Sequence, residues 1–431
     1  MVTRARNRIG SPVRLAALTI LIVATFVAEA PTTAAPSRPD RVSSAAGPAI
    51  STWQPGQPGQ QGGMYGQPGD RLPPGTPPAP GPLAHGRSGS QSARAPGVTW
   101  GPRAGTTPFA PGYVAPPLDL RHLDRDLPLV QTGEPLPSAF DWRDDGMVTA
   151  VKQQDGCGTC WAFGTTSALE SAVLMAEGIG YDFSEQSAAL CVDPAWTYYY
   201  DDADDPCLAG GWSWLASESF IRKGASLESC NPYDPNALMC DSTCPGCDTC
   251  PVVKRVNGYR FVTGDQGATD LIKQAVHEHG PTTMAFFWAS EHAYTTGEPY
   301  FTVYDYVGCP TEVGFANHLV SIIGWDDHVP HSETPGEGAW LVKNSWGAEW
   351  GNDGTFWLAY DSSCMTEIAY LTYEAQDSHA ELLYWDEAGL VGSFGYGDTS
   401  AWMTNVFTAQ RDSTLTHVEL WTTDHNTHYT I

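Results

Sequence analysis

The sequence predicts an α+β fold in which a helix-rich half is followed by a strand-rich half. Between residues 136 and 258, apolar residues recur at helical spacing and are separated by loops. From residue 259 onward, short runs rich in β-branched and aromatic residues alternate with turn residues, which is typical of antiparallel strands. Two such halves pack into one domain with a groove between them, and substrate sites commonly lie in such grooves.

Each half contains recognisable elements. In the first half, the apolar spacing after Cys160 predicts a helix that stops at Gly178, and residues 212–223 predict a second helix. A third helix is expected over residues 270–279, before Gly280 and Pro281. Strands are expected over residues 282–288, 318–325, 339–343, 354–360 and 367–373.

The flanking segments differ in composition from this domain. Arginines followed by the uncharged residues 15–28 predict a secretory signal over residues 1–30, too short to span a bilayer. Residues 31–117 are rich in Pro, Gly and Ser and predict a disordered spacer. Residues 118–135 are expected to be a connector. Alternatively, residues 119–134 are a short segment that blocks the groove between the two halves. Beyond the domain at residues 136–375, alternating apolar runs at residues 383–387, 394–398, 401–408 and 415–421 predict an incomplete all-β domain over residues 380–431. These runs resemble the start of a lectin-like domain, so a cell-surface glycan is a candidate partner.

Three distant segments carry residues suited to nucleophilic catalysis. Cys160 would lie in the first turn of its helix, where unpaired N–H groups favour a thiolate, and Gln154 offers an amide donor nearby. His318 begins one predicted strand, and Asn344 follows another. An imidazole that takes the thiol proton needs a partner to orient it, and Asn344 suits that task. Trp346 would shield their hydrogen bond from water.

These motifs together resemble the papain family of cysteine peptidases. The similarity runs from about residue 136 to residue 373 and includes Gln154 with Cys160-Trp161, Asn317-His318, and Lys343-Asn-Ser-Trp-Gly347. It implies the papain-like fold of a helical half and an antiparallel β half. It also implies that Cys160 is the nucleophile, His318 the acid and base, Asn344 its orienter and Gln154 the oxyanion donor, with Cys160 and His318 acting as a thiolate–imidazolium pair. Thr159 departs from the pattern, because Ser or Ala usually precedes the nucleophile.

The resemblance also implies a substrate-binding strip and pocket. The backbones of Gly210 and Gly211 would pair with an extended polypeptide, and the carbonyl of Asn317 would bind the substrate beside the cleaved bond. An apolar pocket would take the P2 side chain, the second one on the amino side of that bond, which predicts an endopeptidase that prefers hydrophobic P2 residues. Its walls would be Trp212, Trp214, Ala285, Leu319 and Ala369.

The chain has 11 cysteines, an odd number that leaves ten once the nucleophile is set aside. The resemblance implies three disulfides: Cys157–Cys207, Cys191–Cys240 and Cys309–Cys364. The pairing of Cys230, Cys244, Cys247 and Cys250 stays open between disulfides and a zinc site. No metal or other cofactor is expected for the reaction itself.

Charge and composition restrict the partners. The net charge is −27 and most acidic residues follow residue 117, which argues against nucleic acid. We therefore expect a secreted or cell-surface protein, without a membrane span after signal removal, that acts on polypeptides. Two alternatives remain. One is a glycan-binding adhesin with an inert peptidase fold, and the other is a thiol–disulfide oxidoreductase that uses Cys157 and Cys160.

Overall fold

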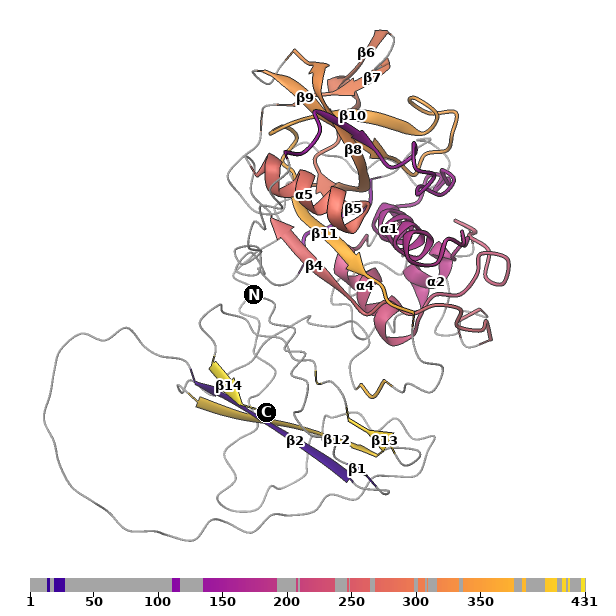
Figure 1. The fold of residues 1–431 in the computed structure, drawn as a ribbon. Helices are drawn as coiled ribbons and strands as arrows, with labels where there is room; N and C mark the ends of the chain where they lie inside the picture. The colour runs from indigo at the N-terminus through magenta and orange to yellow at the C-terminus, as the bar shows by residue number, and fades with distance from the viewer. Residues whose placement is uncertain are drawn as a thin grey trace, which may run out of the picture. The chain divides into compact units, whose positions relative to one another are not determined.

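The structure is a computed structural model. It describes residues 14–15, 19–27, 111–116, 135–191, 207, 210–236, 246–247, 249–263, 268–297, 301–306, 308, 316–332, 336–375, 382–384, 400–408, 413–415, 418 and 428–430. Residues 135–375 contain the predicted helical and strand-rich halves (Figure 1).

The helical half is built around α1 (Cys160–Glu177), whose side chains are mostly buried. The helix ends where Gly178 adopts φ 69°, a left-handed conformation that glycine tolerates, and its N–H bonds to the carbonyl of Leu174. Two further helices, α2 (Glu185–Leu190) and α4 (Ser213–Arg222), pack against it. The predicted helices after Cys160 and over residues 212–223 are therefore present, the second slightly shorter.

A nine-stranded sheet forms the second half. Its order is β4-β11-β5-β8-β9-β10-β7-β6, with β3 (Ala139–Asp141) also paired to β8. The helix α5 (Thr269–His279) contacts β8 and β11. The other strands are β4 (Gly258–Thr263), β5 (Thr282–Phe286), β6 (Ala293–Gly297), β7 (Phe301–Tyr304), β8 (His318–Pro330), β9 (Glu337–Lys343), β10 (Thr355–Ala359) and β11 (Thr366–Thr372).

The prediction of an antiparallel sheet is wrong at one position. Strand β7 pairs with β10 in parallel, through Val303 with Trp357 and Tyr304 with Leu358. Strand β7 belongs to the hairpin β6–β7, which adds to the free edge of β10. Alternation of apolar residues predicts that a strand has one buried face, but it does not encode the direction of its neighbour, so this pairing escaped prediction.

The two halves share a continuous apolar cluster. It joins Trp161 and Leu169 of α1 with Trp214 of α4, and it continues into the sheet through Ala285 of β5 and Leu319 of β8. Ser321 of β8 donates its hydroxyl to the carbonyl of Gly164 in α1 at 2.8 Å. The start of α1 is thereby fixed against the start of β8.

Smaller strands lie outside this domain. Strand β12 (Ser400–Thr408) pairs with β2 (Thr19–Val27), which also pairs with β14 (His428–Thr430). Strands β1 (Arg14–Leu15) and β13 (Ser413–Thr414) form a second pair. Strand β12 matches a predicted strand of the all-β region, whereas β2 lies inside the predicted signal. Within the described residues, helices of sufficient length and apolar character to cross a membrane are absent.

Candidate active site

The sheet and α1 bring three predicted residues to one place. Cys160 is the first residue of α1, His318 is the first residue of β8, and Asn344 directly follows β9. Strands β8 and β9 are neighbours in the sheet, and α1 packs against β8. All three side chains are buried.

The imidazole of His318 is held on two sides. Its Nε2 lies 2.9 Å from Oδ1 of Asn344, which makes Nε2 the protonated nitrogen, because an amide oxygen only accepts. The ring stacks on Trp346, with centroids 4.6 Å apart and an interplanar angle of 21°. Within the described part of the chain, Nδ1 has no hydrogen-bond partner. The arrangement leaves Nδ1 as the nitrogen that can exchange a proton with a thiol.

Burial favours the uncharged forms of Cys160 and His318. Burial raises the pKa of the Cys160 thiol to about 11, although several backbone N–H groups oppose the rise. Burial also lowers the pKa of His318 to about 4, against the opposing hydrogen bond to Asn344. The charged form of either group is destabilised here, because burial removes the water that would solvate it. The site therefore contains a thiol and a neutral imidazole rather than an ion pair.

The amide of Gln154 connects the two halves close to the start of α1. Its Nε2 donates to the carbonyl of Cys157 at 2.7 Å, and its Oε1 accepts from the hydroxyl of Ser345 at 2.5 Å. Ser345 follows Asn344 and donates its backbone N–H to Oδ1 of that residue at 2.8 Å. Gln154 and Asn344 are thus coupled through one serine.

The unusual Thr159 has a polar partner of its own. It caps α1 without a side-chain bond to the helix, and its hydroxyl instead lies 2.8 Å from the hydroxyl of Tyr233. The same Tyr233 hydroxyl donates to the carbonyl of Gln154 at 2.9 Å. Thr159 is accommodated, and it ties the start of α1 to the segment that carries Gln154.

Residues 111–116, here called the groove segment, lie along the predicted substrate strip. The N–H of Tyr113 donates to the carbonyl of Asn317 at 2.9 Å, and that of Val114 donates to the carbonyl of Gly211 at 3.0 Å. The N–H of Gly211 donates to the carbonyl of Gly112 at 2.9 Å, and Tyr113 and Gly211 form a parallel bridge. Gly210 also lies against the segment, because a Cβ there would be 2.4 Å from the carbonyl oxygen of Gly112.

Two predictions concerned the chain before the domain. Residues 31–117 were expected to be disordered throughout, and this is wrong for residues 111–116, whose backbone is hydrogen-bonded to the domain. The predicted blocking segment, residues 119–134, lies outside the described residues. Gly112 and Tyr113 were not among the predicted site residues, although apolar residues are denser here than in the rest of the tract.

The predicted pocket residues gather around the same place. Trp212, Trp214, Ala285, Leu319 and Ala369 belong to one buried apolar cluster. Tyr113 of the groove segment is part of this cluster, and its exposed fraction is 2%. The groove segment therefore contributes a buried tyrosine to the cluster that contains the predicted pocket residues.

The disulfides agree with the resemblance at one bridge and differ at another. Cys157 is bonded to Cys207, as predicted. Cys191 is bonded to Cys247, not to Cys240, so that prediction is wrong. The family resemblance indicated a partner for Cys191 from the order of the cysteines along the chain. The actual partner is the cysteine whose sulfur lies within bonding distance after folding. Cys364 is disulfide-bonded, but the predicted partner Cys309 lies outside the described residues.

The remaining cysteines bear on two alternatives. Cys230 is bonded to Cys250. Since Cys247 and Cys250 are both in disulfides, they are not thiolate ligands for zinc, and the described residues contain no cluster that would hold a metal. Cys160 is free while Cys157 is bonded elsewhere. The two do not form the exchangeable pair that an oxidoreductase would need.

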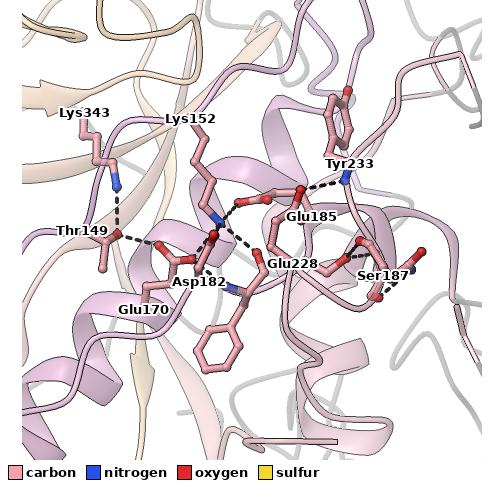
Figure 2. Close-up of polar contacts among 12 residues, drawn as sticks. Thr149, Lys152, Glu170, Asp182, Glu185, Ser187, Glu228, Tyr233 and Lys343 are labelled. Carbon is pink, nitrogen blue, oxygen red and sulfur yellow. Dashed lines mark hydrogen bonds and ion pairs between the residues drawn. The ribbon is translucent and has the colours of Figure 1, made fainter. Parts of the chain in front are cut away.

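A charged cluster, buried except for Asp182, is centred on Lys152 (Figure 2). The ammonium of Lys152 is 2.8 Å from Glu170, 2.7 Å from Asp182 and 2.9 Å from Glu185. Thr149 donates to Glu170 at 2.5 Å and accepts from Lys343 at 3.1 Å. Lys343 is the last residue of β9, so the cluster links the helical half to the strand that carries Asn344.

Burial and neighbouring charge shift the titration of this cluster. Burial lowers the pKa of Lys152, but Glu185 and Glu170 outweigh it and the net pKa is raised. Burial raises the pKa of Glu185 to about 8, with Lys152 opposing, and lowers the pKa of Lys343 to about 8, with Glu170 opposing. Lys152 is the fixed positive charge around which the other groups are arranged.

Comparisons with known proteins agree with this geometry. Residues 136–374 match the family model described as "Papain family cysteine protease", and residues 382–431 match "Lectin like domain". "Thiol protease aleurain" of Arabidopsis thaliana is 35% identical over 226 residues, which are 51% of this chain and 55% of that protein. "Pro-cathepsin H" of Medicago truncatula is 35% identical over 228 residues, which are 51% and 56%. The chain thus spans little more than half the length of these relatives.

One solved structure combines both kinds of domain. The cysteine protease and lectin-like domains of Cwp84, a surface-layer-associated protein of Clostridium difficile, are 24% identical. The alignment has a TM-score of 0.49 and covers 63% of this chain and 57% of that one.

Proposed function

This chain belongs to the papain family of cysteine proteases, and we propose that it hydrolyses peptide bonds with Cys160 as nucleophile. The supporting observation is the arrangement of His318, in which Asn344 occupies Nε2 and leaves Nδ1 for the thiol. Cys160 is also the single free cysteine of the described residues, and it begins a helix whose N-terminus favours negative charge.

The proposed reaction has two stages. Nδ1 of His318 takes the proton of Cys160, the thiolate attacks the scissile carbonyl, and the imidazolium then protonates the leaving amine. Water, deprotonated by His318, hydrolyses the thioester. Asn344 keeps the imidazole oriented throughout, while Trp346 excludes water from their hydrogen bond.

An oxyanion forms in both stages and needs donors. The Gln154 amide carries two N–H groups, and one donates to the Cys157 carbonyl. We assign the second, with the backbone N–H of Cys160, to the oxyanion. The hydrogen bond from Ser345 to Oε1 fixes which end of the amide is the nitrogen.

The substrate in this proposal is an extended polypeptide. Its backbone would pair with Gly211 and with the carbonyl of Asn317, and its P2 side chain would enter the apolar pocket. We propose endopeptidase action with hydrophobic P2 residues preferred. We also propose secretion or display at the cell surface, supported by the apolar residues 15–28 and the three disulfides. A role of the lectin-like region in glycan binding stays a prediction.

Covalent labelling tests the activity. The full chain is incubated with an epoxysuccinyl inhibitor of cysteine peptidases, long enough for slow opening of a covered site, and the adduct is mapped by mass spectrometry. We expect an adduct on Cys160 and loss of cleavage of dipeptidyl fluorogenic substrates. We expect Cys160→Ala to form no adduct and to cleave none of these substrates. Glycan binding without any adduct or turnover would instead support the adhesin alternative.

A further inference from the structure

We propose that Tyr233 is a positioning residue for the oxyanion site, because its hydroxyl connects the two chain segments that carry the proposed oxyanion donors. One donor is the side-chain amide of Gln154, and the other is the backbone N–H of Cys160. The inference rests on the proposed function, because it concerns the reaction at the same site. It assigns a role to a tyrosine in the loop that follows α4.

The directions of the two hydrogen bonds follow from the number of protons available. A tyrosine hydroxyl has one proton, and Tyr233 donates it to the backbone carbonyl of Gln154 at 2.9 Å. The hydroxyl of Thr159 lies 2.8 Å from the same oxygen and is therefore the donor in that contact. Burial raises the pKa of Tyr233 above its usual value, so its hydroxyl stays protonated. The result is a hydrogen-bonded chain from Thr159 through Tyr233 to Gln154, in which each bond strengthens the next.

The carbonyl that Tyr233 holds belongs to a turn that needs support. Asp155, the next residue after Gln154, has φ 53°, a left-handed conformation that persists in a residue with a Cβ only where the surroundings hold it. The side chain of Gln154 spans the same turn, because its Nε2 donates to the carbonyl of Cys157 at 2.7 Å. A rotation of the peptide between residues 154 and 155 would therefore move the amide that we assign to the oxyanion.

The other end of the hydrogen-bonded chain reaches the second donor. The N–H of Cys160 and the carbonyl of Thr159 belong to one planar peptide, so they point in opposite directions. That carbonyl accepts from the N–H groups of Ala162 at 2.9 Å and Phe163 at 3.2 Å in the first turn of α1. The side chain of Thr159 makes no capping bond to the helix and is left to bond Tyr233. The hydroxyl of Tyr233 thus acts on the peptides that present both donors.

Tyr233 is itself held by its ring and by its backbone. Its ring packs edge to face on Phe163 of α1, with centroids 4.8 Å apart and an interplanar angle of 88°. Its backbone N–H donates to Oε1 of Glu228 at 2.7 Å (Figure 2). Three residues earlier, Cys230 is bonded to Cys250. A hydroxyl on a side chain that is fixed in this way can fix the groups bonded to it.

The test uses full chains that carry Gly112→Val, because the N–H of Gly112 in the groove segment contacts the sulfur of Cys160 in the native chain. A Cβ at position 112 would lie 1.9 Å from the carbonyl oxygen of Gly158, a backbone atom, so the segment cannot keep its place. This Gly112→Val protein is the parent with which the further variants are compared.

Four further variants separate the hydroxyls from the side chains that carry them. Tyr233→Phe removes the hydroxyl and keeps the ring. Thr159→Val removes the other hydroxyl of the pair, whereas Thr159→Ser keeps it. Tyr360→Phe is the control, because Tyr360 also donates its hydroxyl at 2.8 Å, to Asp327 near the end of β8 that is opposite to His318.

Steady-state kinetics with a dipeptidyl substrate give the first measurement. We expect Tyr233→Phe to lower kcat about tenfold with little change in KM, a smaller loss than the 100-fold or more that removal of an oxyanion donor itself causes. We expect Thr159→Val to lower kcat about threefold, because the bond from Tyr233 to Gln154 remains. Thr159→Ser and Tyr360→Phe should match the parent.

Two reagents then distinguish the oxyanion donors from the thiol. With a peptide aldehyde, the sulfur of Cys160 bonds to the aldehyde carbon and the thiol proton moves to the aldehyde oxygen, which needs the same donors as the oxyanion. A small aromatic disulfide exchanges with the thiol and releases an aromatic thiol, without any carbonyl. We expect Tyr233→Phe to weaken aldehyde binding about tenfold and to change the rate of disulfide exchange less than about twofold.

Each other outcome overturns the proposal. Unchanged aldehyde binding in Tyr233→Phe would show that the hydroxyl does not act on the oxyanion donors. Equal losses with the aldehyde and with the disulfide would show that the mutation displaces the thiol, which is a structural role. Thermal unfolding checks that each variant is folded. If Tyr233→Phe does not fold, Thr159→Val decides by the same two reagents, because it keeps the tyrosine.

The two proposals fail in different ways. Full activity and full aldehyde binding in both Tyr233→Phe and Thr159→Val would reject the role of Tyr233 and leave the peptidase standing. Absence of turnover, of aldehyde binding and of epoxysuccinyl labelling in the folded parent would reject the peptidase and the role of Tyr233 with it.

Discussion

His318 lies between Asn344, which accepts from its Nε2 at 2.9 Å, and Trp346, whose ring stacks on the imidazole at 4.6 Å. Hydrogen bonding and stacking together fix both the tautomer and the plane of the ring. Trp346 in turn contacts Trp288 and Trp350 edge to face, with centroids 4.9 Å away in each case. The orientation of the imidazole is therefore maintained by a packed aromatic group rather than by one hydrogen bond.

Removal of the amide at Asn344 should reduce turnover more than binding. In the Gly112→Val background, we expect Asn344→Ala to lower kcat by about 100-fold, because a misoriented base loses that much, with little change in KM. Steady-state kinetics with a dipeptidyl substrate measure both constants. A rise in KM with kcat near the parent value would show that Asn344 does not position the imidazole.

Coverage of the site by the groove segment should depend on pH. In the covered state the pKa of His318 is lowered to about 4 from 6.5, so that state loses stability relative to an open one as pH falls below 6.5. The pKa of Cys160 is raised to about 11 from 9.0, so the covered state also loses relative stability above pH 9. Asn344, Trp346 and Phe286 face the imidazole and carry no charge that would reverse this. The segment should hold best between about pH 6.5 and 9.

The effect is isolated by dividing the epoxysuccinyl labelling rate of wild type by that of Gly112→Val, because the intrinsic reactivity of the Cys160 thiol cancels in this ratio. We expect the ratio to be lowest near neutral pH and to approach one as pH falls toward 4. A ratio that stays constant from pH 7 to pH 4 would contradict the coupling between His318 and the covered state.

Lys152 should be essential for stability. Its removal leaves Glu170 and Glu185, whose side chains are 1% and 2% exposed, without their main counter-charge. We expect Lys152→Met to reduce the free energy of unfolding by about 3–5 kcal/mol, as for other broken buried pairs. Arg143→Met is the control, because Arg143 and Asp141 are 38% and 21% exposed, and we expect about 0–1 kcal/mol there.

The loss at Lys152 should itself vary with pH. The pKa of Glu185 is raised to about 8 from 4.5, so its contribution to stability falls as pH rises from 4.5 through about 8. Without Lys152 the ionised carboxylate is disfavoured further, so the pKa of Glu185 rises above 8 and the difference between variant and wild type should widen as pH rises from about 8, where Glu185 ionises in the wild type alone. Urea unfolding at several pH values measures it, and a difference that narrows with rising pH would exclude this account.

The predicted pocket suggests a substrate preference. Because the predicted pocket residues Trp212, Leu319 and Ala369 belong to a buried apolar cluster rich in aromatic side chains, we expect peptides with Tyr or Phe at P2 to be cleaved faster than those with Gly. A peptide library profiled with the Gly112→Val protein gives kcat/KM for each P2 residue. Dominance of Arg at P2 would be inconsistent with an apolar pocket.

Sequence alone predicted the elements that carry the site. The spacing after Cys160 predicted α1 with its end at Gly178, and the apolar runs around His318 and before Asn344 predicted β8 and β9. These elements are long and strongly patterned, so local sequence contains their signal. The convergence of Cys160, His318 and Asn344 came from the family motifs, because spacing cannot place distant segments side by side.

Two features could not be predicted in this way. The bond from Cys191 to Cys247 depends on where a cysteine-rich loop folds, and several cysteines there were equivalent by spacing alone. The groove segment is held by hydrogen bonds to Asn317, Gly211 and Cys160 and by one buried tyrosine. It needs no repeated apolar face, so its sequence shows no hydrophobic period. The Pro/Gly-rich composition of the tract as a whole led to its interpretation as unstructured, although apolar residues are denser around residues 111–116.

The short distance along the chain between the groove segment and the domain has a kinetic consequence. Only residues 117–134 separate residue 116 from the first described residues of the domain, so the tether keeps the local concentration of the hexapeptide near the millimolar range. A ligand of modest intrinsic affinity then suffices to fill the cleft. A single cut within the tether removes that advantage, since the released fragment is diluted into bulk solvent and does not return.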